Sequence, residues 1–193
     1  MENTNHQSAI RKALPWAAIV IIPALLAVAN YVFWASLHQS MWKTDTWFHL
    51  MRLFDLQQTT SAGQVPALVN ANSFLNIGQA FNGMYPTYSL WPLVALFHGL
   101  GAMHQWLAVQ SAILYLASSL TAVYLFLLTR HTSFSLIMSI ASVWTPAWLD
   151  YTMNGSLGMM WGTAMLPAVL VACYLVLTDT HYAPIIHEGG ENG

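Results

Sequence analysis

The chain has 193 residues, of which 6% are Asp, Glu, Lys or Arg and 56% are hydrophobic, and its mean hydropathy is +0.51. Soluble domains carry roughly 25% charged residues, so this composition indicates an integral membrane protein. A formal net charge of −2 without any basic run excludes an electrostatic surface for nucleic acid, and a single cysteine, Cys173, excludes a disulfide framework and a thiolate metal cluster within the chain.

The first apolar segment follows Arg11 and Lys12 and runs from Leu14 to Ser36. This segment is too long for the h-region of a cleaved signal peptide, which has about 7–15 residues. We therefore expect an anchor that stays in the membrane. Because Lys and Arg beside a span favour the cytoplasmic side, residues 1–13 are predicted to be cytoplasmic. The connection over residues 37–84 is then a large first outer loop.

Three further segments reach the length of about 17–25 apolar residues that a membrane helix needs. They are Trp106–Leu128, Ser133–Leu149 at the short limit, and Leu157–Leu177. A fifth segment, Tyr85–Met103, contains proline and glycines, so a span, a re-entrant segment and an interfacial helix remain as alternatives. We favour the interfacial alternative, which places Asp150 outside.

These segments predict an all-α integral membrane fold. We expect a polytopic bundle of 4–5 transmembrane helices over residues 14–178, with an amphipathic helix in the outer loop 37–84. Residues 179–193 are polar and rich in glycine, and resemble the ragged end of a longer chain. The expected location is the cell membrane.

The stretch "KTDTWFHLMRLF", residues 43–54, concentrates charge in a chain that has little. On a helix Asp45, His49 and Arg52 share one face, because they lie at positions i, i+4 and i+7. The opposite side carries the apolar residues Trp47, Leu50, Met51 and Phe54. We therefore predict an amphipathic helix on the outer membrane surface, which presents an acid, an imidazole and a guanidinium to water or to an enclosed cleft.

This trio has a plausible use with a phosphate-bearing lipid. An aspartate acts as a general base or holds a divalent cation such as Mg or Mn, a histidine relays a proton or binds a ligand, and the guanidinium fork fits a phosphate. Structural alternatives stay open for each. Asp45 is also a good N-cap residue. His49 is as readily explained as a surface histidine, and Arg52 as an ion-pair partner of Asp45 or Asp55.

A second acid, Asp150, closes an apolar run in "WTPAWLDYTMNGSLG". It is either an ordinary residue at a helix end or, if it lies outside, a neighbour of Asp45. Two adjacent carboxylates can share a cation or divide base and binding roles. In the outer loop, Gln79 and Asn82 are amides of the kind that bind sugar hydroxyls, although amides in turns need no ligand.

Taken in order, "DTWFHLMRLFDL", "SAGQVPALVN", "GQAFNGMYPTYSLWPLVALFHGLG" and "TPAWLDYTMNGSLGMMWGTAMLPAVLV" resemble a family of multi-pass membrane proteins labelled 6-pyruvoyl-tetrahydropterin synthase-related. They also resemble the more distant YfhO-like proteins. The resemblance covers roughly residues 11–178. The matching residues are Asp45, His49, Arg52, Gly63, Pro66, Gly83, Tyr85, Pro86, Asp150, Tyr151, Gly155, Gly158 and Pro167.

Such families are similar to the GT-C class of membrane glycosyltransferases. The resemblance implies a polyprenyl-phosphate-linked sugar as donor, cell-envelope glycan as acceptor, Asp45 as the catalytic or metal-holding acid, and Asp150 as a second acid. It makes Arg52 a candidate phosphate contact. The candidate substrate-binding residues are His49, Arg52, Gln79, Asn82 and Tyr85.

The chain departs from these relatives in two ways. Where they show Arg-Gly and then Gly-Glu after the second acid, it has Asn154-Gly155 and Gly158-Met159. Relatives are also several times longer. The departures keep a different hypothesis open: a non-catalytic membrane protein that binds lipid head groups or assembles with a longer polytopic partner. A transporter is disfavoured, because no ionisable residue lies deep in a predicted span.

Overall fold

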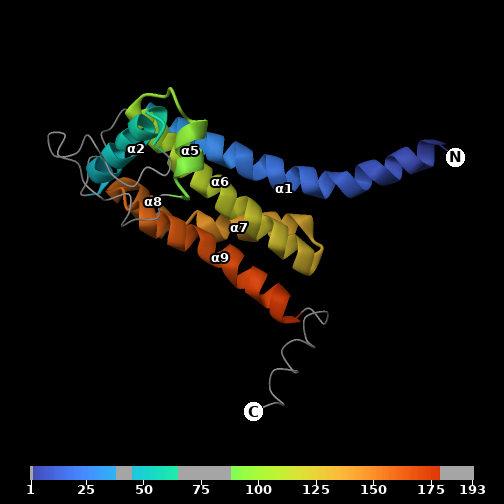
Figure 1. The fold of residues 1–193 in the computed structure, drawn as a ribbon. Helices are drawn as coiled ribbons and strands as arrows, with labels where there is room; N and C mark the ends of the chain where they lie inside the picture. Colours follow the sequence, from blue (N-terminus) through green and yellow to red (C-terminus); the bar gives the residue numbers. More distant parts are fainter. Residues whose placement is uncertain (1, 38–44, 65–87, 179–193) are drawn as a thin grey trace, which may run out of the picture. The chain divides into compact units, whose positions relative to one another are not determined.

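The computed structural model describes residues 2–37, 45–64 and 88–178, and the side chains from residue 13 onwards. Every regular element in these ranges is a helix (Figure 1). The helices are α1 (Glu2–Ser36), α2 (Thr46–Ser61), α5 (Trp91–Leu96), α6 (Ala102–Thr129), α7 (Thr132–Val143), α8 (Pro146–Asn154) and α9 (Leu157–Thr178). The predicted all-α fold is confirmed.

Three of the helices are long and apolar enough to cross a membrane. They are the 24 residues Ala13–Ser36 of α1, the 28 residues of α6 and the 22 residues of α9. At a rise of 1.5 Å per residue each exceeds the roughly 30 Å of a hydrocarbon core. The chain is therefore a multi-pass helical membrane protein, as its composition predicts.

The predicted span Ser133–Leu149 is wrong as a single helix. The structure divides it into α7 and α8, with a bend at Trp144 and Thr145. Pro146 explains the break, because proline lacks an N–H donor and disfavours helical backbone at the preceding residue. With 12 residues, α7 is only about 18 Å long, too short to cross by itself.

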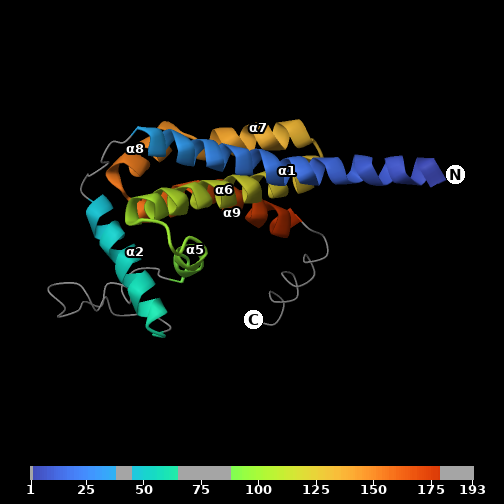
Figure 2. The same cartoon turned by 90° about the horizontal axis from the view of Figure 1, so that it is seen from above.

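The described part of the ambiguous segment Tyr85–Met103 does not form a span. Residues 88–101 contain only α5, which has six residues and is followed by a turn in which Gly99 has φ +92°. Pro92 stands in the first turn of α5, where its missing N–H costs nothing. Helix α5 packs against α2, as Figure 2 shows. The alternative of a non-spanning segment therefore fits the structure.

The chain forms two compact units. The first comprises residues 1–26, 114–145 and 161–193. Its hydrophobic cluster contains Ile19, Ala122, Phe126 and Leu136, and the ring of Trp16 meets that of Phe126 edge-on, with centroids 5.1 Å apart. The contacts that these residues of α1 make in this unit are aromatic and aliphatic, as expected for an apolar anchor.

The second unit comprises residues 27–113 and 146–160 and joins the ends of three long helices. Buried Asn30 on α1 donates to Ser111 Oγ on α6 at 3.0 Å. The Nε2 of Gln110 on α6 lies 3.9 Å from the sulfur of Met160 on α9. Polar contacts of this kind hold membrane helices together. The C-terminal end of α1 and the N-terminal ends of α6 and α9 therefore meet in this unit.

Candidate functional site

Asp45 stands at the N-cap position of α2, but its side chain makes no cap hydrogen bond. Its backbone is helical, with φ −100° and ψ −15°, whereas a capping residue usually has extended backbone. The carboxylate instead accepts a hydrogen bond from Ser156 Oγ at 3.3 Å. The Asp45 backbone N–H donates to the Asn154 carbonyl, also at 3.3 Å. Asp45 therefore occupies the N-cap position of α2, but its side chain and its backbone N–H bind the turn between α8 and α9.

The α8–α9 turn lies directly against the first residue of α2. Gly155 has φ +74°, and a Cβ at this position would overlap both the backbone and the side chain of Thr46. Thr46 is itself fully buried. Glycine is thus required at position 155 for two reasons. L-amino acids with a side chain disfavour this backbone conformation, and Thr46 leaves no space for a Cβ atom. The contact fixes the place at which α2 begins.

Asp150 reaches the same turn from α8. Its Oδ1 accepts a hydrogen bond from Asn154 Nδ2 at 3.0 Å. Asn154 therefore hydrogen-bonds to both acidic residues: its backbone carbonyl accepts from the Asp45 N–H, and its side-chain amide donates to the Asp150 carboxylate. Asp45 and Asp150 are both exposed. The structure thus brings the two predicted acids to one turn, although they are far apart in sequence.

His49 and Arg52 lie together on α2 and are buried, with 6% and 4% of their surfaces exposed. The Arg52 NH1 group and His49 Nδ1 are 3.2 Å apart. A guanidinium has no acceptor, so Nδ1 must accept this hydrogen bond and the imidazole proton sits on Nε2. The imidazole stacks on Trp106 of α6, with ring centroids 6.0 Å apart and planes 9° apart. The guanidinium carbon lies 5.8 Å from the centre of the Phe48 ring.

The predicted meeting of His49 and Arg52 is confirmed, but Asp45 does not share their buried surroundings. The Asp45 carboxylate is exposed and accepts a hydrogen bond from Ser156 on the α8–α9 turn, whereas the His49 and Arg52 side chains are buried. The prediction that all three side chains face one cleft is therefore corrected. An exposed acid and a buried imidazole–guanidinium pair occupy successive turns at the start of α2.

Burial lowers the pKa of His49 to about 4, with the Arg52 charge adding to the effect and Asp45 opposing it. The imidazole is consequently neutral at pH 7, in agreement with its acceptor role towards Arg52. A base with such a low pKa is weak, and general bases work best with a pKa near the operating pH. The expected proton-relay role of His49 is thus disfavoured, and a structural role in holding α2 on α6 is favoured.

This pKa predicts a loss of stability in acid. The unfolded histidine takes up a proton near pH 6.5 and the folded one only near pH 4, so between these values the unfolded state binds more protons and the free energy of unfolding falls as pH falls. The full loss is on the order of 3 kcal/mol. Thermal unfolding of the detergent-solubilised chain between pH 7 and pH 4 measures it.

A His49→Gln variant provides the control for this pH prediction. Glutamine keeps an acceptor for Arg52 but does not titrate, so the variant is expected to lose less stability than the wild-type protein over the same pH range. Equal pH slopes for the two proteins would show that His49 is not buried in its neutral form.

The two acids supply oxygen donors of the kind that Mg²⁺ and Mn²⁺ take. In the described part of the chain no group of three or more His, Cys, Asp or Glu residues gathers in one place. Asp45, Asp150 and the Ser156 hydroxyl are the donors at the turn. Mg²⁺ is commonly held by one or two carboxylates together with water and substrate phosphate, so these are the residues that would hold a cation which binds with its substrate.

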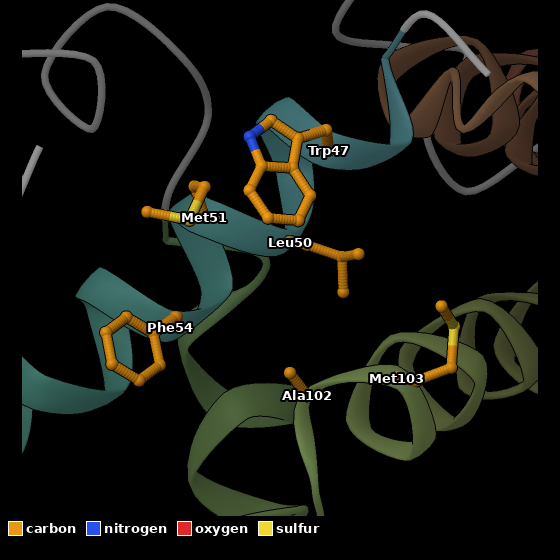
Figure 3. Close-up of a pocket in the computed structure, with 6 residues that line it drawn as sticks. All are labelled: Trp47, Leu50, Met51, Phe54, Ala102 and Met103. Carbon is orange, nitrogen blue, oxygen red and sulfur yellow. The ribbon is translucent and has the colours of Figure 1, made fainter. Parts of the chain in front are cut away.

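An open groove lies beside α2, on the side that carries the predicted apolar face. Its volume is about 390 Å³. All four residues of the predicted face line it, which confirms that they act as one surface (Figure 3). The described residues that line it are Trp47, Leu50, Met51, Phe54, Ala102 and Met103. In Figure 3 Leu50 extends from α2 towards the start of α6, with the rings of Trp47 and Phe54 on either side of it.

Sequence reasoning missed two contributors to the site. Ser156 binds Asp45 and Trp106 stacks on His49. The "NGS" run after Asp150 marks a turn, but only the fold shows which helix it contacts. Three predicted substrate-binding residues, Gln79, Asn82 and Tyr85, lie outside the described residues.

No family model, curated protein or solved structure matches this chain. Its function is therefore inferred from its own residues.

Proposed function

We propose that this chain is the N-terminal module of a GT-C-like membrane glycosyltransferase, which moves a sugar from a polyprenyl phosphate to a cell-envelope glycan. The observation that carries the proposal is the exposed Asp45 carboxylate, which Ser156 binds at the junction of three long helix ends, with Asp150 on the same turn. The resemblance to 6-pyruvoyl-tetrahydropterin synthase-related and YfhO-like membrane proteins supports it. With the cytoplasmic N-terminus that Arg11 and Lys12 predict, this junction would lie on the outer side of the membrane.

In the proposed reaction Asp45 is the general base. It takes the proton of an acceptor hydroxyl as the acceptor oxygen forms its bond to the anomeric carbon, and the bond from that carbon to the phosphate oxygen breaks. The polyprenyl phosphate leaves with the electron pair of the broken bond. Asp150 binds the donor or, together with Asp45, holds a divalent cation. A bound cation would neutralise the charge of the leaving phosphate.

Burial changes the roles that the resemblance implies for Arg52 and His49. With 4% of its surface exposed, the Arg52 side chain as it lies does not reach a phosphate at the membrane surface. We therefore assign Arg52 and His49 to positioning, because their contacts with each other and with Trp106 hold α2 in place. Asp45, directly before α2, depends on that placement.

A donor-consumption assay tests this function. The full chain is reconstituted in nanodiscs with radiolabelled polyprenyl-phosphate hexoses and a cell-envelope glycan acceptor, and the release of polyprenyl phosphate is measured. Turnover above that of empty nanodiscs is expected for one donor. Absence of turnover with every hexose tested would count against catalysis by this chain.

The surface of α9 favours a second candidate, a non-catalytic assembly partner for a longer polytopic protein. Leu166, Val169 and Leu170 are each more than half exposed, and a Cβ on Gly158 or Gly162 would meet no other atom within 4 Å. Small residues four apart on an apolar helix allow another helix to approach closely. Co-purification with a second polytopic protein would support this candidate, whereas a monodisperse active monomer would contradict it.

A further inference from the structure

The apolar groove beside α2 is independent of the two acids and of the proposed reaction. Among the described residues, its lining contains only aliphatic, thioether and aromatic side chains: Trp47, Leu50, Met51 and Phe54 on α2, and the first two residues of α6. At about 390 Å³ it falls within the usual range for small-molecule sites, about 300–1,000 Å³. Such sites normally add a few polar groups that orient a polar ligand, and this lining offers none.

The position of the groove along α6 indicates its surroundings. Ala102 and Met103 are the first residues of a helix that is long and apolar enough to cross the membrane. The start of a membrane helix lies at the boundary between head groups and hydrocarbon. A groove at this end of α6 is therefore within reach of the lipid chains of the adjoining leaflet.

The exposed side chains of α2 match this boundary. Trp47 is 59% exposed and Phe54 is 42% exposed, and they stand seven residues apart, on one face of the helix. Tryptophan is enriched at membrane interfaces, and a helix with such a face lies in the interface plane. The opposite side of α2 is anchored in protein through His49 on Trp106.

We propose that the groove holds one acyl chain of a phospholipid from the surrounding bilayer. The chain fills the space between Trp47, Phe54 and the start of α6, which removes apolar surface from water. Helix α2 is then held from two sides, by protein at His49 and by lipid at Trp47. The lipid is a structural ligand and is distinct from the sugar donor of the proposed reaction.

Brominated lipids test the proposal, because bromine on an acyl chain quenches a tryptophan that touches it. The full chain is placed in phosphatidylcholine nanodiscs with and without acyl-chain bromine. The emission of Trp47 is obtained as the difference between the wild-type protein and Trp47→Phe. We expect acyl-chain bromine to quench this emission and aqueous iodide to leave it unchanged. A Trp148→Phe difference is the matched control, because Trp148 is 1% exposed and its emission should respond to neither quencher.

Filling the groove separates a bound chain from simple contact with the bilayer. Ala102→Phe places a ring where the acyl chain would lie, so the bromine quenching of Trp47 should be lost. Ala102→Leu is the smaller second variant if Ala102→Phe fails to fold, as judged by circular dichroism. Quenching that persists in the filled groove overturns the proposal. Quenching of Trp47 by iodide would mean that the groove faces water. Quenching by neither reagent would mean that protein covers the groove. Either result also overturns the proposal.

Discussion

Gly155→Ala is expected to destabilise the chain more than any other alanine substitution at a described glycine. The left-handed backbone, with φ +74°, costs an alanine about 1–2 kcal/mol. Its Cβ would also overlap backbone atoms of Thr46, which cannot rotate away as a side chain can, and overpacking of this kind costs about 1–3 kcal/mol. Together these terms predict a fall of roughly 4–20 °C in Tm for a chain of this size, measured by thermal unfolding in detergent.

Gly158→Ala is the matched control for this prediction. Gly158 lies three residues further on, in α9, and a Cβ there meets nothing within 4 Å. Alanine is the better helix former by about 0.5–1 kcal/mol, so this variant should unfold at the same temperature as the wild-type protein or slightly above it. Equal Tm values for the Gly155→Ala and Gly158→Ala variants would mean that the α8–α9 turn does not touch α2.

Asp45→Asn is expected to abolish glycosyl transfer without affecting insertion into the membrane. Asparagine keeps the size of the side chain, an oxygen for the Ser156 hydroxyl and the backbone N–H that binds Asn154. It cannot accept a proton at neutral pH, and loss of a general base typically slows a reaction about 100- to 10,000-fold. The rate of polyprenyl-phosphate release measures the effect, with Tm as the check on folding.

Gln58→Ala provides the comparison on the same helix. Gln58 is exposed and stands in the second half of α2, so its loss should leave both transfer and Tm unchanged. A wild-type rate for Asp45→Asn would remove Asp45 from catalysis even if the chain is a transferase.

The long helices are the part of the fold that the sequence predicts best. The predicted segment Leu157–Leu177 agrees with α9, Leu157–Thr178, to within one residue at each end, and the predicted segment Leu14–Ser36 ends at the same residue as α1. Unbroken apolar length identifies such helices because backbone polar groups must be satisfied within the segment. Apolar length alone misses a break at a single residue, and Pro146 divides a run that is otherwise as apolar as a span.

Within α2, local spacing predicts local contacts. His49 and Arg52 are one turn apart and do meet, and the apolar face predicted around Trp47 and Phe54 lines one groove. The period of a helix does not say which face is covered by the rest of the protein. Here the polar pair is buried and the two aromatic residues are exposed, an arrangement that spacing alone did not indicate.

Contacts between residues distant in sequence remain beyond this kind of reasoning. The expected outer location of Asp150 allows it to approach Asp45, and the structure places both at the Asn154 turn. The identity of the bridging residues is a different matter. Ser156 binds Asp45 from 111 residues away. Asn154-Gly155 indicates a turn locally, but the contact of Gly155 with Thr46 depends on the tertiary fold.

Disulfide cross-linking between positions 45 and 156 tests most directly whether Asp45 is held by the α8–α9 turn. The protein carries Asp45→Cys and Ser156→Cys, with Cys173→Ser to remove its exposed free thiol, and is oxidised in native membranes. Because the native side chains are 3.3 Å apart, rapid formation of an intramolecular disulfide is expected. The control protein carries Asp45→Cys with Thr178→Cys, at the far end of α9, in place of Ser156→Cys. This pair should remain reduced. Failure of the 45–156 pair to cross-link under conditions that oxidise free thiols would contradict the placement of Asp45 and the site built on it.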